Sequence, residues 1–321
     1  MEPTLYLLAC DTVERGGGVF RFRVTPAGLL EKIGCYPCDR PMYAVMEGGR
    51  LHILLRAPFA GSEESGYFSL SPDLTSPTPL RPTGGKCACH LAVAGGDIYV
   101  TNYLSGNLVR FGGEVAAHTG HGVNPARQAM PHTHCAILSP DKKYVLCCDL
   151  GLDTLFCYDR ALNPVCQCKV APGDGIRHAV FSQDGKYVYA VSEMVPALYV
   201  FSFEGGALTL LSRTPIPCET PHADGAAIRL ADGDETLYVS CRVENALFVY
   251  SVDGARLTLK QKADCGGDSP RDFLPFGNFL AVTNEKSDNV VVYARPTGKL
   301  GAPLSDTPLA HPLCCVLAED A

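Results

Sequence analysis

The sequence predicts an all-β fold, a seven-bladed β-propeller whose ring closes where the last strand joins the first blade. Three observations carry the prediction: an internal repeat with a period in the forties, almost no helical periodicity, and chain ends that complement each other. A period of that length with several short strands per unit is typical of β-propellers, whereas helical repeats need apolar residues at a spacing of about 3.6. We expect one domain spanning residues 1–321.

The repeat is clearest in a segment that reads as the second strand of each unit. Seven copies superimpose on their third residues, which are spaced by 46, 47, 47, 43, 49 and 43 positions. These third residues are Tyr6, His52, Tyr99, Leu146, Tyr189, Tyr238 and Ala281. Seven copies predict seven blades.

Two further strands accompany most copies of the repeat. The segments before it, which read as first strands, are 42–47, 89–94, 134–139, 177–182, 225–230 and 271–276. The segments after it, which read as third strands, are 17–24, 65–71, 107–112, 154–160, 197–203, 246–252 and 289–295. Turn sequences such as "SQDGK" join first to second strands, as expected for tight hairpins.

The chain ends supply the closure of the ring. Residues 4–10 form a second-strand copy with no first strand before it, and residues 311–319 read as a first strand without a blade of its own. We therefore expect the two ends to share one blade.

Composition and charge argue against several classes of function. A net charge of −7 argues against nucleic acid as a partner, because phosphate backbones select basic surfaces. No apolar run approaches the roughly 20 residues of a membrane span, and the start of the chain has no basic leader. The sixteen cysteines include the adjacent pairs Cys147–Cys148 and Cys314–Cys315, and others lie inside apolar runs. That placement favours reduced core residues and a cytoplasmic protein.

Polar residues gather at one end of the predicted hairpins. In a propeller the first strand lines the central channel, so the starts of first strands and the ends of second strands emerge at the same mouth. The residues at first-strand starts are His90, His134, Arg177, His178 and Arg271. Those at second-strand ends are Asn102, Asp149, Glu193, Arg242, Asn284 and Glu285. Because the opposite rim carries ordinary turn residues, the polar mouth is the expected binding site, although any one of these residues alone could be a solvated loop residue.

Three segments, 132–151, 175–193 and 269–293, resemble the lactonase-type seven-bladed propellers. That family includes bacterial 6-phosphogluconolactonases of the propeller class and the fungal carboxy-cis,cis-muconate cyclase. The resemblance implies an active site of one histidine, two arginines and one glutamate, which fall here on His134, Arg177, Arg242 and Glu193. Departures from the family pattern are Ile176 in place of a proline, Leu55 and Arg56 in place of Asn-Glu, and Ala227 in place of an acid.

The resemblance implies hydrolysis of a sugar-derived lactone, foremost 6-phosphogluconolactone. Glu193 would activate water, Arg177 and His134 would stabilise the oxyanion, and Arg242 would hold the carboxylate or phosphate of an anionic substrate. Additional substrate contacts are expected from His90, Asn102, Asp149, His178, Arg271 and Asn284. Among these His178 is the weakest candidate, since strand alternation should turn it away from Arg177. We expect no cofactor, no metal, and a monomer or weak homodimer.

Two other functions remain open from sequence alone. The same residues would serve the reverse chemistry, closing a lactone on a muconate-type diacid. A non-catalytic propeller that binds a ligand or protein would need exposed aromatics at the rim, where only Tyr103 and Phe59 are found. Two motifs give only weak evidence for a metal site. The motif "CYPC" at Cys35–Cys38 lacks a second pair of ligands, and "HTH" at His132–His134 fits ordinary strand alternation.

Overall fold

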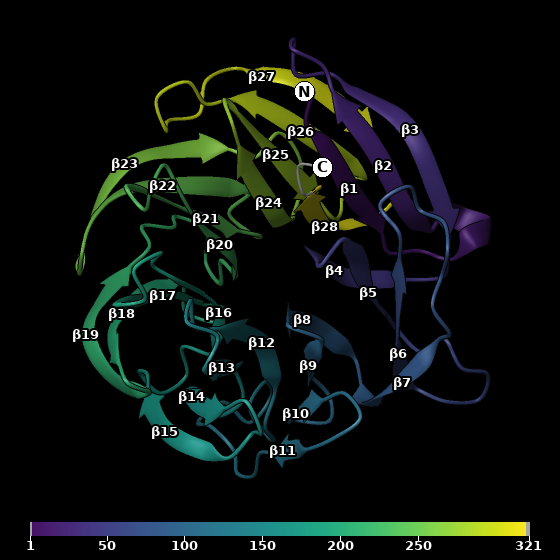
Figure 1. Ribbon diagram of the computed structural model, residues 1–321. Helices are drawn as coiled ribbons and strands as arrows, with labels where there is room; N and C mark the ends of the chain where they lie inside the picture. Colours follow the sequence, from purple (N-terminus) through teal and green to yellow (C-terminus); the bar gives the residue numbers. More distant parts are fainter. Residues whose placement is uncertain (1, 319–321) are drawn as a thin grey trace.

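The chain folds into a ring of seven four-stranded antiparallel sheets, seen along the ring axis in the computed structural model, which describes residues 2–318 (Figure 1). Blade 1 has the strand order β28-β1-β2-β3, and blades 2 to 7 each take four consecutive strands from β4 to β27. The C-terminal strand β28 pairs antiparallel with β1, from Leu5 opposite Leu317 to Ala9 opposite Pro312. The predicted propeller and its closure by the last strand are confirmed.

Each blade runs from an inner strand at the channel to an outer strand at the rim. The inner strands are β28 (Pro312–Leu317), β4 (Pro41–Glu47), β8 (Ala88–Ala94), β12 (Thr133–Leu138), β16 (Ile176–Phe181), β20 (Gly225–Ala231) and β24 (Pro270–Phe276). The second strands are β1 (Thr4–Ala9), β5 (Arg50–Leu55), β9 (Asp97–Asn102), β13 (Tyr144–Asp149), β17 (Tyr187–Ser192), β21 (Thr236–Cys241) and β25 (Phe279–Asn284).

The two outer positions complete the sheets. The third strands are β2 (Gly18–Val24), β6 (Glu64–Leu70), β10 (Asn107–Arg110), β14 (Thr154–Asp159), β18 (Ala197–Glu204), β22 (Ala246–Asp253) and β26 (Asn289–Ala294). The outermost strands are β3 (Leu30–Pro37), β7 (Arg81–Lys86), β11 (Val115–Ala117), β15 (Pro164–Lys169), β19 (Ala207–Pro215), β23 (Arg256–Asp264) and β27 (Pro303–Pro308). A single 3-10 turn, η1 (Val13–Arg15), is the helical element of residues 2–318.

The hydrophobic core lies between neighbouring blades. Second and third strands are almost fully buried, and their apolar side chains form clusters that join one blade to the next. Cysteines such as Cys147 and Cys157 belong to this core, and all sixteen cysteines, each within the described chain, are free thiols. Among residues 2–318 there is no helix with the length and apolarity needed to cross a membrane.

The repeated tyrosines bridge neighbouring blades. Tyr6, Tyr99 and Tyr189 are buried, and their hydroxyls donate to the carbonyl oxygens of Pro72, Arg160 and Gly254 at 2.7, 2.8 and 2.8 Å. Each acceptor lies in the following blade. The hydroxyl of Tyr238 donates in the same way to Gly298. These bonds explain why a tyrosine recurs at the third position of the repeat.

The Tyr189→Phe substitution should therefore destabilise the ring. Removing the hydroxyl leaves the Gly254 carbonyl without its partner, which should lower the free energy of unfolding by about 1–2 kcal/mol. Thermal melts followed by circular dichroism would measure the change. Tyr144→Phe is the control, because the Tyr144 hydroxyl has no hydrogen-bond partner within the described residues. Equal melting temperatures for the two variants would contradict the bridging role.

A β-bulge near the start of every inner strand positions the side chains at the channel mouth. The pairing with the second strand skips Met42, Cys89, His134, Arg177 and Arg271 in five blades. It skips Leu313 in blade 1, and both Ala226 and Ala227 in blade 6. A bulge places an extra residue on one strand and changes the direction of its side chain. The bulge therefore lets two successive residues of one inner strand face the channel. The regular alternation of side chains along a strand would not allow this.

Candidate active site

A pocket of about 200 Å³ opens at the mouth where the inner strands begin. Five bulge residues contribute to its wall: Met42, Cys89, His134, Arg177 and Arg271. The residue that directly follows the second strand contributes in four other places: Arg56, Tyr103, Glu193 and Arg242. Two structural positions, the bulge residue and the residue after the second strand, thus supply most of the pocket wall, and Cys87 completes it.

The backbone holds the residues after the second strands in equivalent places. The N–H of Glu193 donates to the Gly175 carbonyl at 2.8 Å, and the N–H of Arg242 donates to Asp224 at 2.7 Å. Tyr103 makes the same bond to Cys87 at 3.0 Å. Each bond ties the end of a second strand to the residues just before the inner strand of its own blade. The side chain that follows is thereby directed over the channel.

Asn102, Asp149 and Asn284 do not lie at the mouth as the sequence analysis expected. Each sits one residue earlier, on the last position of its second strand, so its side chain points to the other face of the sheet. All three are fully buried. Their partners lie within the protein: Thr83 and Asn107 for Asn102, the His132 N–H for Asp149, and the Cys265 carbonyl for Asn284.

Glu193 is the centre of an ion-pair network. One carboxylate oxygen accepts from Arg127, and the other accepts from Arg177 and lies 3.1 Å from Arg242 Nη2. The side chain of Glu193 is 5% exposed and that of Arg177 is 4% exposed. Burial by itself would raise the pKa of Glu193, but Arg177 and Arg242 outweigh it and hold the pKa well below its ordinary value. Glu193 is therefore a carboxylate at neutral pH.

Glycine at position 225 lets blade 6 approach this network. The Gly225 N–H donates to the Glu193 carbonyl at 3.0 Å. A Cβ atom at Gly225 would lie 2.1 Å from the Ser192 carbonyl oxygen, closer than real atoms come. The close contact keeps Arg242, on blade 6, within reach of Glu193 on blade 5.

His134 offers an imidazole without a partner. The residue is 4% exposed, and its Nδ1 atom has no hydrogen-bond partner within residues 2–318. Burial, and next the positive charge of Arg177, lower the pKa of His134 well below its ordinary value. The ring is therefore neutral at neutral pH. It meets the Tyr103 ring edge to face at 5.7 Å between centroids.

The positive charge at the mouth exceeds the negative charge. Arg271 pairs with Glu285 at 3.3 Å, and Arg242 lies 3.3 Å from Asp224 as well as near Glu193. Arg56 and Arg127 bring the guanidinium groups at the mouth to five, against these three carboxylates, among the residues that the structure describes. The pocket can therefore attract an anion, although the whole chain is acidic.

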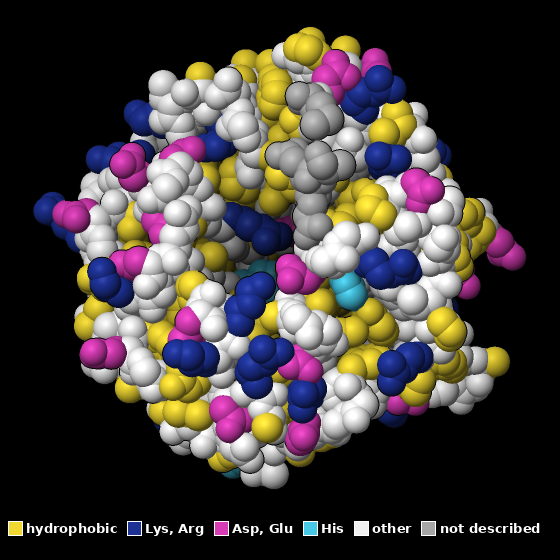
Figure 2. All heavy atoms as spheres, in the orientation of Figure 1, with side chains coloured by type: hydrophobic (Ala, Val, Ile, Leu, Met, Phe, Trp, Pro, Cys, Tyr) yellow, Lys and Arg dark blue, Asp and Glu magenta, His cyan; other side chains and the backbone are white. Residues whose placement is uncertain are grey.

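His178 and His90 lie deeper in the channel. Sequence reasoning expected His178 to point away from Arg177, and this is wrong: both residues line the narrow part of the channel, because the bulge at Arg177 removes the alternation. Beyond that constriction a cavity of about 450 Å³, lined in part by His90 and His178, opens toward the other face. Figure 2 shows the molecule along the ring axis, with a central hollow in which cationic and histidine side chains are visible.

Comparison with known proteins identifies the family of this chain. The model of the family described as "Lactonase, 7-bladed beta-propeller" matches residues 6–317. The chain belongs to this family. A 6-phosphogluconolactonase of Bacillus subtilis is 32% identical over 255 residues, which are 72% of this chain and 73% of the relative.

Solved structures of other propellers share the fold of this lactonase-family chain. A protein from Lactobacillus plantarum has a TM-score of 0.90 at 26% identity, covering 99% of this chain and 100% of that one. A periplasmic gluconolactonase of Pseudomonas aeruginosa has a TM-score of 0.88 at 24% identity, covering 99% of both chains. The second likeness shows the fold alone.

Arg127 is a mouth residue that sequence reasoning missed in this lactonase-family chain. It lies in residues 118–132, the longest connection between two blades in the described chain, and its side chain is 41% exposed above Glu193. No repeat position predicts it, because no other blade has this loop. The unusual length of the segment between two recognisable strands was the one available signal.

Proposed function

We propose that this chain hydrolyses 6-phosphogluconolactone to 6-phosphogluconate at the pocket formed by the mouth residues. The observation that carries the proposal is the surplus of guanidinium groups around a small pocket that also contains an unpartnered neutral imidazole. Such a pocket suits a small anionic ester whose reaction generates further negative charge. Membership of the lactonase family and the similarity to the Bacillus subtilis 6-phosphogluconolactonase support the choice of substrate.

Hydrolysis adds water across the lactone ester. The water oxygen bonds to the carbonyl carbon, the ring C–O bond breaks, and the water proton passes to the released hydroxyl group. His134 takes and returns this proton, because one of its ring nitrogens is unpartnered and the ring is neutral. These facts favour His134 over Glu193, the base expected from the sequence, since both Glu193 oxygens are occupied by arginines.

Arg177 and Arg242 stabilise the oxyanion that forms on the carbonyl oxygen. A fixed guanidinium group placed beforehand at this position stabilises the transition state more than the substrate, which accelerates the reaction. Glu193 acts as a positioning residue that orients these two arginines. Arg271 and Arg56, which line the same pocket, contact the sugar hydroxyls or the carbonyl end of the substrate.

Arg127 recognises the phosphate group. The phosphate is at the end of the substrate farthest from the lactone carbonyl, and Arg127 lies above Glu193 with 41% of its side chain exposed. A planar guanidinium binds phosphate oxygens with two parallel hydrogen bonds. This role does not require Arg127 to touch the reacting atoms.

The Arg127→Ala variant tests this role with two substrates. We expect kcat/KM to fall about 10–100-fold for 6-phosphogluconolactone, the loss for one charged hydrogen-bonded contact, and to change little for glucono-δ-lactone. Arg81→Ala is the control, because Arg81 lies on outer strand β7 against Phe111 and far from the mouth. An equal loss on both lactones would show that Arg127 acts through Glu193 and not through phosphate.

The wild-type protein tests the function itself. Product release from 6-phosphogluconolactone, corrected for spontaneous hydrolysis, is expected to exceed that from carboxymuconolactone. Absence of enzymatic hydrolysis of either lactone would overturn the proposal, and faster turnover of the muconate compound would assign the alternative chemistry.

We further propose a cytoplasmic monomer or weak homodimer. Sixteen free thiols support a reducing compartment, because disulfides persist mainly in oxidising ones. Charged residues on the outer strands, such as Lys260 and Lys262 on β23, oppose edge-to-edge pairing of blades from different chains.

A further inference from the structure

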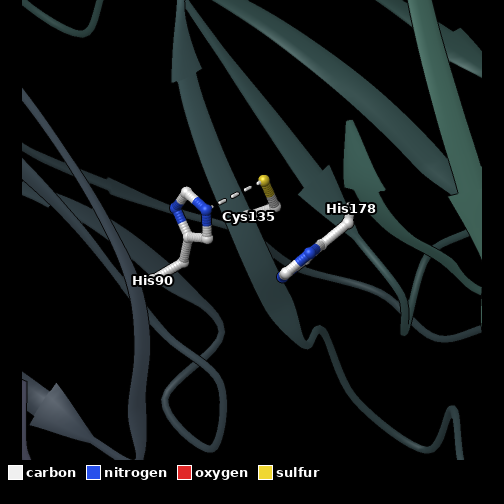
Figure 3. A group of neighbouring side chains, drawn as sticks. All are labelled: His90, Cys135 and His178. Atoms are coloured by element: carbon white, nitrogen blue, oxygen red, sulfur yellow. Dashed lines mark hydrogen bonds between the residues drawn. The ribbon is translucent and has the colours of Figure 1, made fainter. Parts of the chain in front are cut away.

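Three consecutive blades bring two imidazoles and a thiol together in the channel below the mouth. His90 lies on β8, Cys135 on β12 and His178 on β16, and each directly follows the bulge residue of its inner strand. Figure 3 shows the three side chains next to one another in the channel, with a dashed line joining the His90 ring to the Cys135 sulfur. One potential ligand atom from each residue lies within 4.8 Å of the other two.

We propose that His90, Cys135 and His178 form a binding site for one zinc ion. Zinc is bound in proteins by cysteine thiolates and histidine imidazoles, so one thiolate and two imidazoles suit zinc better than magnesium or calcium. His90 Nε2 lies 3.6 Å from Cys135 Sγ. Two ligands at about 2.0 and 2.3 Å from a tetrahedral zinc are about 3.6 Å apart, so this pair already has the required separation.

His178 would be the third ligand, and its ring is free to turn toward the metal. Neither ring nitrogen of His178 has a hydrogen-bond partner within residues 2–318, and the ring makes only edge contacts with His90 and His134, at 5.2 and 5.3 Å between centroids. A small rotation of the ring would close the remaining gap to the metal. The His178 ring lines the cavity of about 450 Å³, so an ion in that cavity can reach it.

The surroundings of His90 orient its ring. The Tyr43 ring stacks on it at 4.2 Å, and the Ala136 N–H approaches Nδ1 at 3.4 Å. Zinc at Nε2 would place the ring proton on Nδ1 and so remove the contact with Ala136. At 3.4 Å that contact is long for a hydrogen bond, so its loss costs little. Binding would release the Cys135 thiol proton to solvent and needs no change of oxidation state.

The site lies directly below the pocket at the mouth. Its ligand His178 lines the constriction of about 20 Å³ together with Arg177 and His134, and the His178 and His134 rings are 5.3 Å apart. The ion would enter through the cavity of about 450 Å³ on the other side, which His90 and His178 line. A water molecule from that cavity can occupy the fourth position. This proposal replaces the expectation from spacing alone that the chain binds no metal, because the ligands come from three different blades.

Cobalt(II) and zinc(II) binding to the reduced, chelator-treated protein tests the site. We expect one cobalt ion per chain with a thiolate-to-metal charge-transfer band, and displacement of that ion by zinc. Cys135→Ala and His178→Ala should abolish the band. They should weaken zinc binding by more than the 10–100-fold typical of losing an outer-shell partner. Cys314→Ser is the matched control, since Cys314 is a buried thiol at the equivalent position of blade 1 and outside the cluster.

Thermal melts of the three variants show whether each is folded when tested. Unchanged binding by folded Cys135→Ala, or no stoichiometric binding by the wild type, would overturn the site. Loss of binding in Cys314→Ser as well would assign the metal to unspecific thiol binding and would also overturn it. None of these outcomes depends on lactone hydrolysis, so the zinc site and the proposed function fail separately.

Discussion

Replacing His134 by asparagine is expected to lower kcat for lactone hydrolysis about 10²–10⁴-fold with little change in KM, the usual loss for a general base. Asparagine keeps a polar side chain but cannot act as a base near neutral pH. The measurement is steady-state hydrolysis of 6-phosphogluconolactone. His132→Asn is the control, because His132 contacts the Tyr103 carbonyl at 3.0 Å and does not line the pocket. Comparable kinetics for wild type and His134→Asn would rule out the proton-transfer role.

The pH profile gives a second readout of the same residue. Since burial and Arg177 lower the pKa of His134, the neutral, proton-accepting form persists to more acidic pH than for an ordinary histidine, whose pKa is about 6.5. We therefore expect kcat/KM to stay level through neutral pH and to fall only below that ordinary value. The residual activity of His134→Asn should lack this acid limb.

The Glu193→Gln variant is expected to lose both activity and stability. The amide leaves the buried Arg177 charge uncompensated, and removing one partner of a buried ion pair typically costs about 3–5 kcal/mol. Because Arg177 and Arg242 also lose their orientation, kcat should fall about 10²–10³-fold, as when an oxyanion donor is removed. Thermal melts and steady-state kinetics measure the two effects.

The sign of the pH dependence follows from the lowered pKa of Glu193. The ion pairs contribute their full stability above the unfolded-state pKa of about 4.3 and lose it as the pH falls through the lower folded-state pKa. The stability gap between wild type and Glu193→Gln should thus be constant at neutral pH and close only in acid. Glu285→Gln is the control, since the Glu285 side chain is 20% exposed against 5% for Glu193, and its substitution should cost less. A larger loss in Glu285→Gln than in Glu193→Gln would contradict the network.

The propeller ring could be predicted from the sequence because the residues that define the repeat are buried. Tyr99, Tyr189 and Tyr238 recur for a physical reason, the bridge from one blade to the next. The outermost strands were not predicted from the sequence, because their residues alternate between exposed and half-buried, as in β15 and β23. They therefore lack an apolar run. Their positions follow from the hairpins that precede them.

The mouth was predicted in part. His134, Arg177, Glu193 and Arg242 come together as the resemblance implied, and Arg271 joins them. Reading the ends of β9, β13 and β25 one residue too early selected Asn102, Asp149 and Asn284 in place of the positions that follow. The inner-strand bulges have no sequence signature in a single chain, so the direction of His178 could not be derived from alternation.

The seven bulges also have an evolutionary consequence. A bulged residue has no partner across the ladder, so its replacement changes what projects into the channel while every cross-strand pair is kept. Substrate range can therefore diverge at Met42, Cys89 and Leu313 while the strand pairing of the blades is kept, provided that the new side chains fill the same buried space. A mutant library of apolar residues of similar volume at these three positions should keep the ring folded, and selection from it would explore new lactones on the same strand pairing.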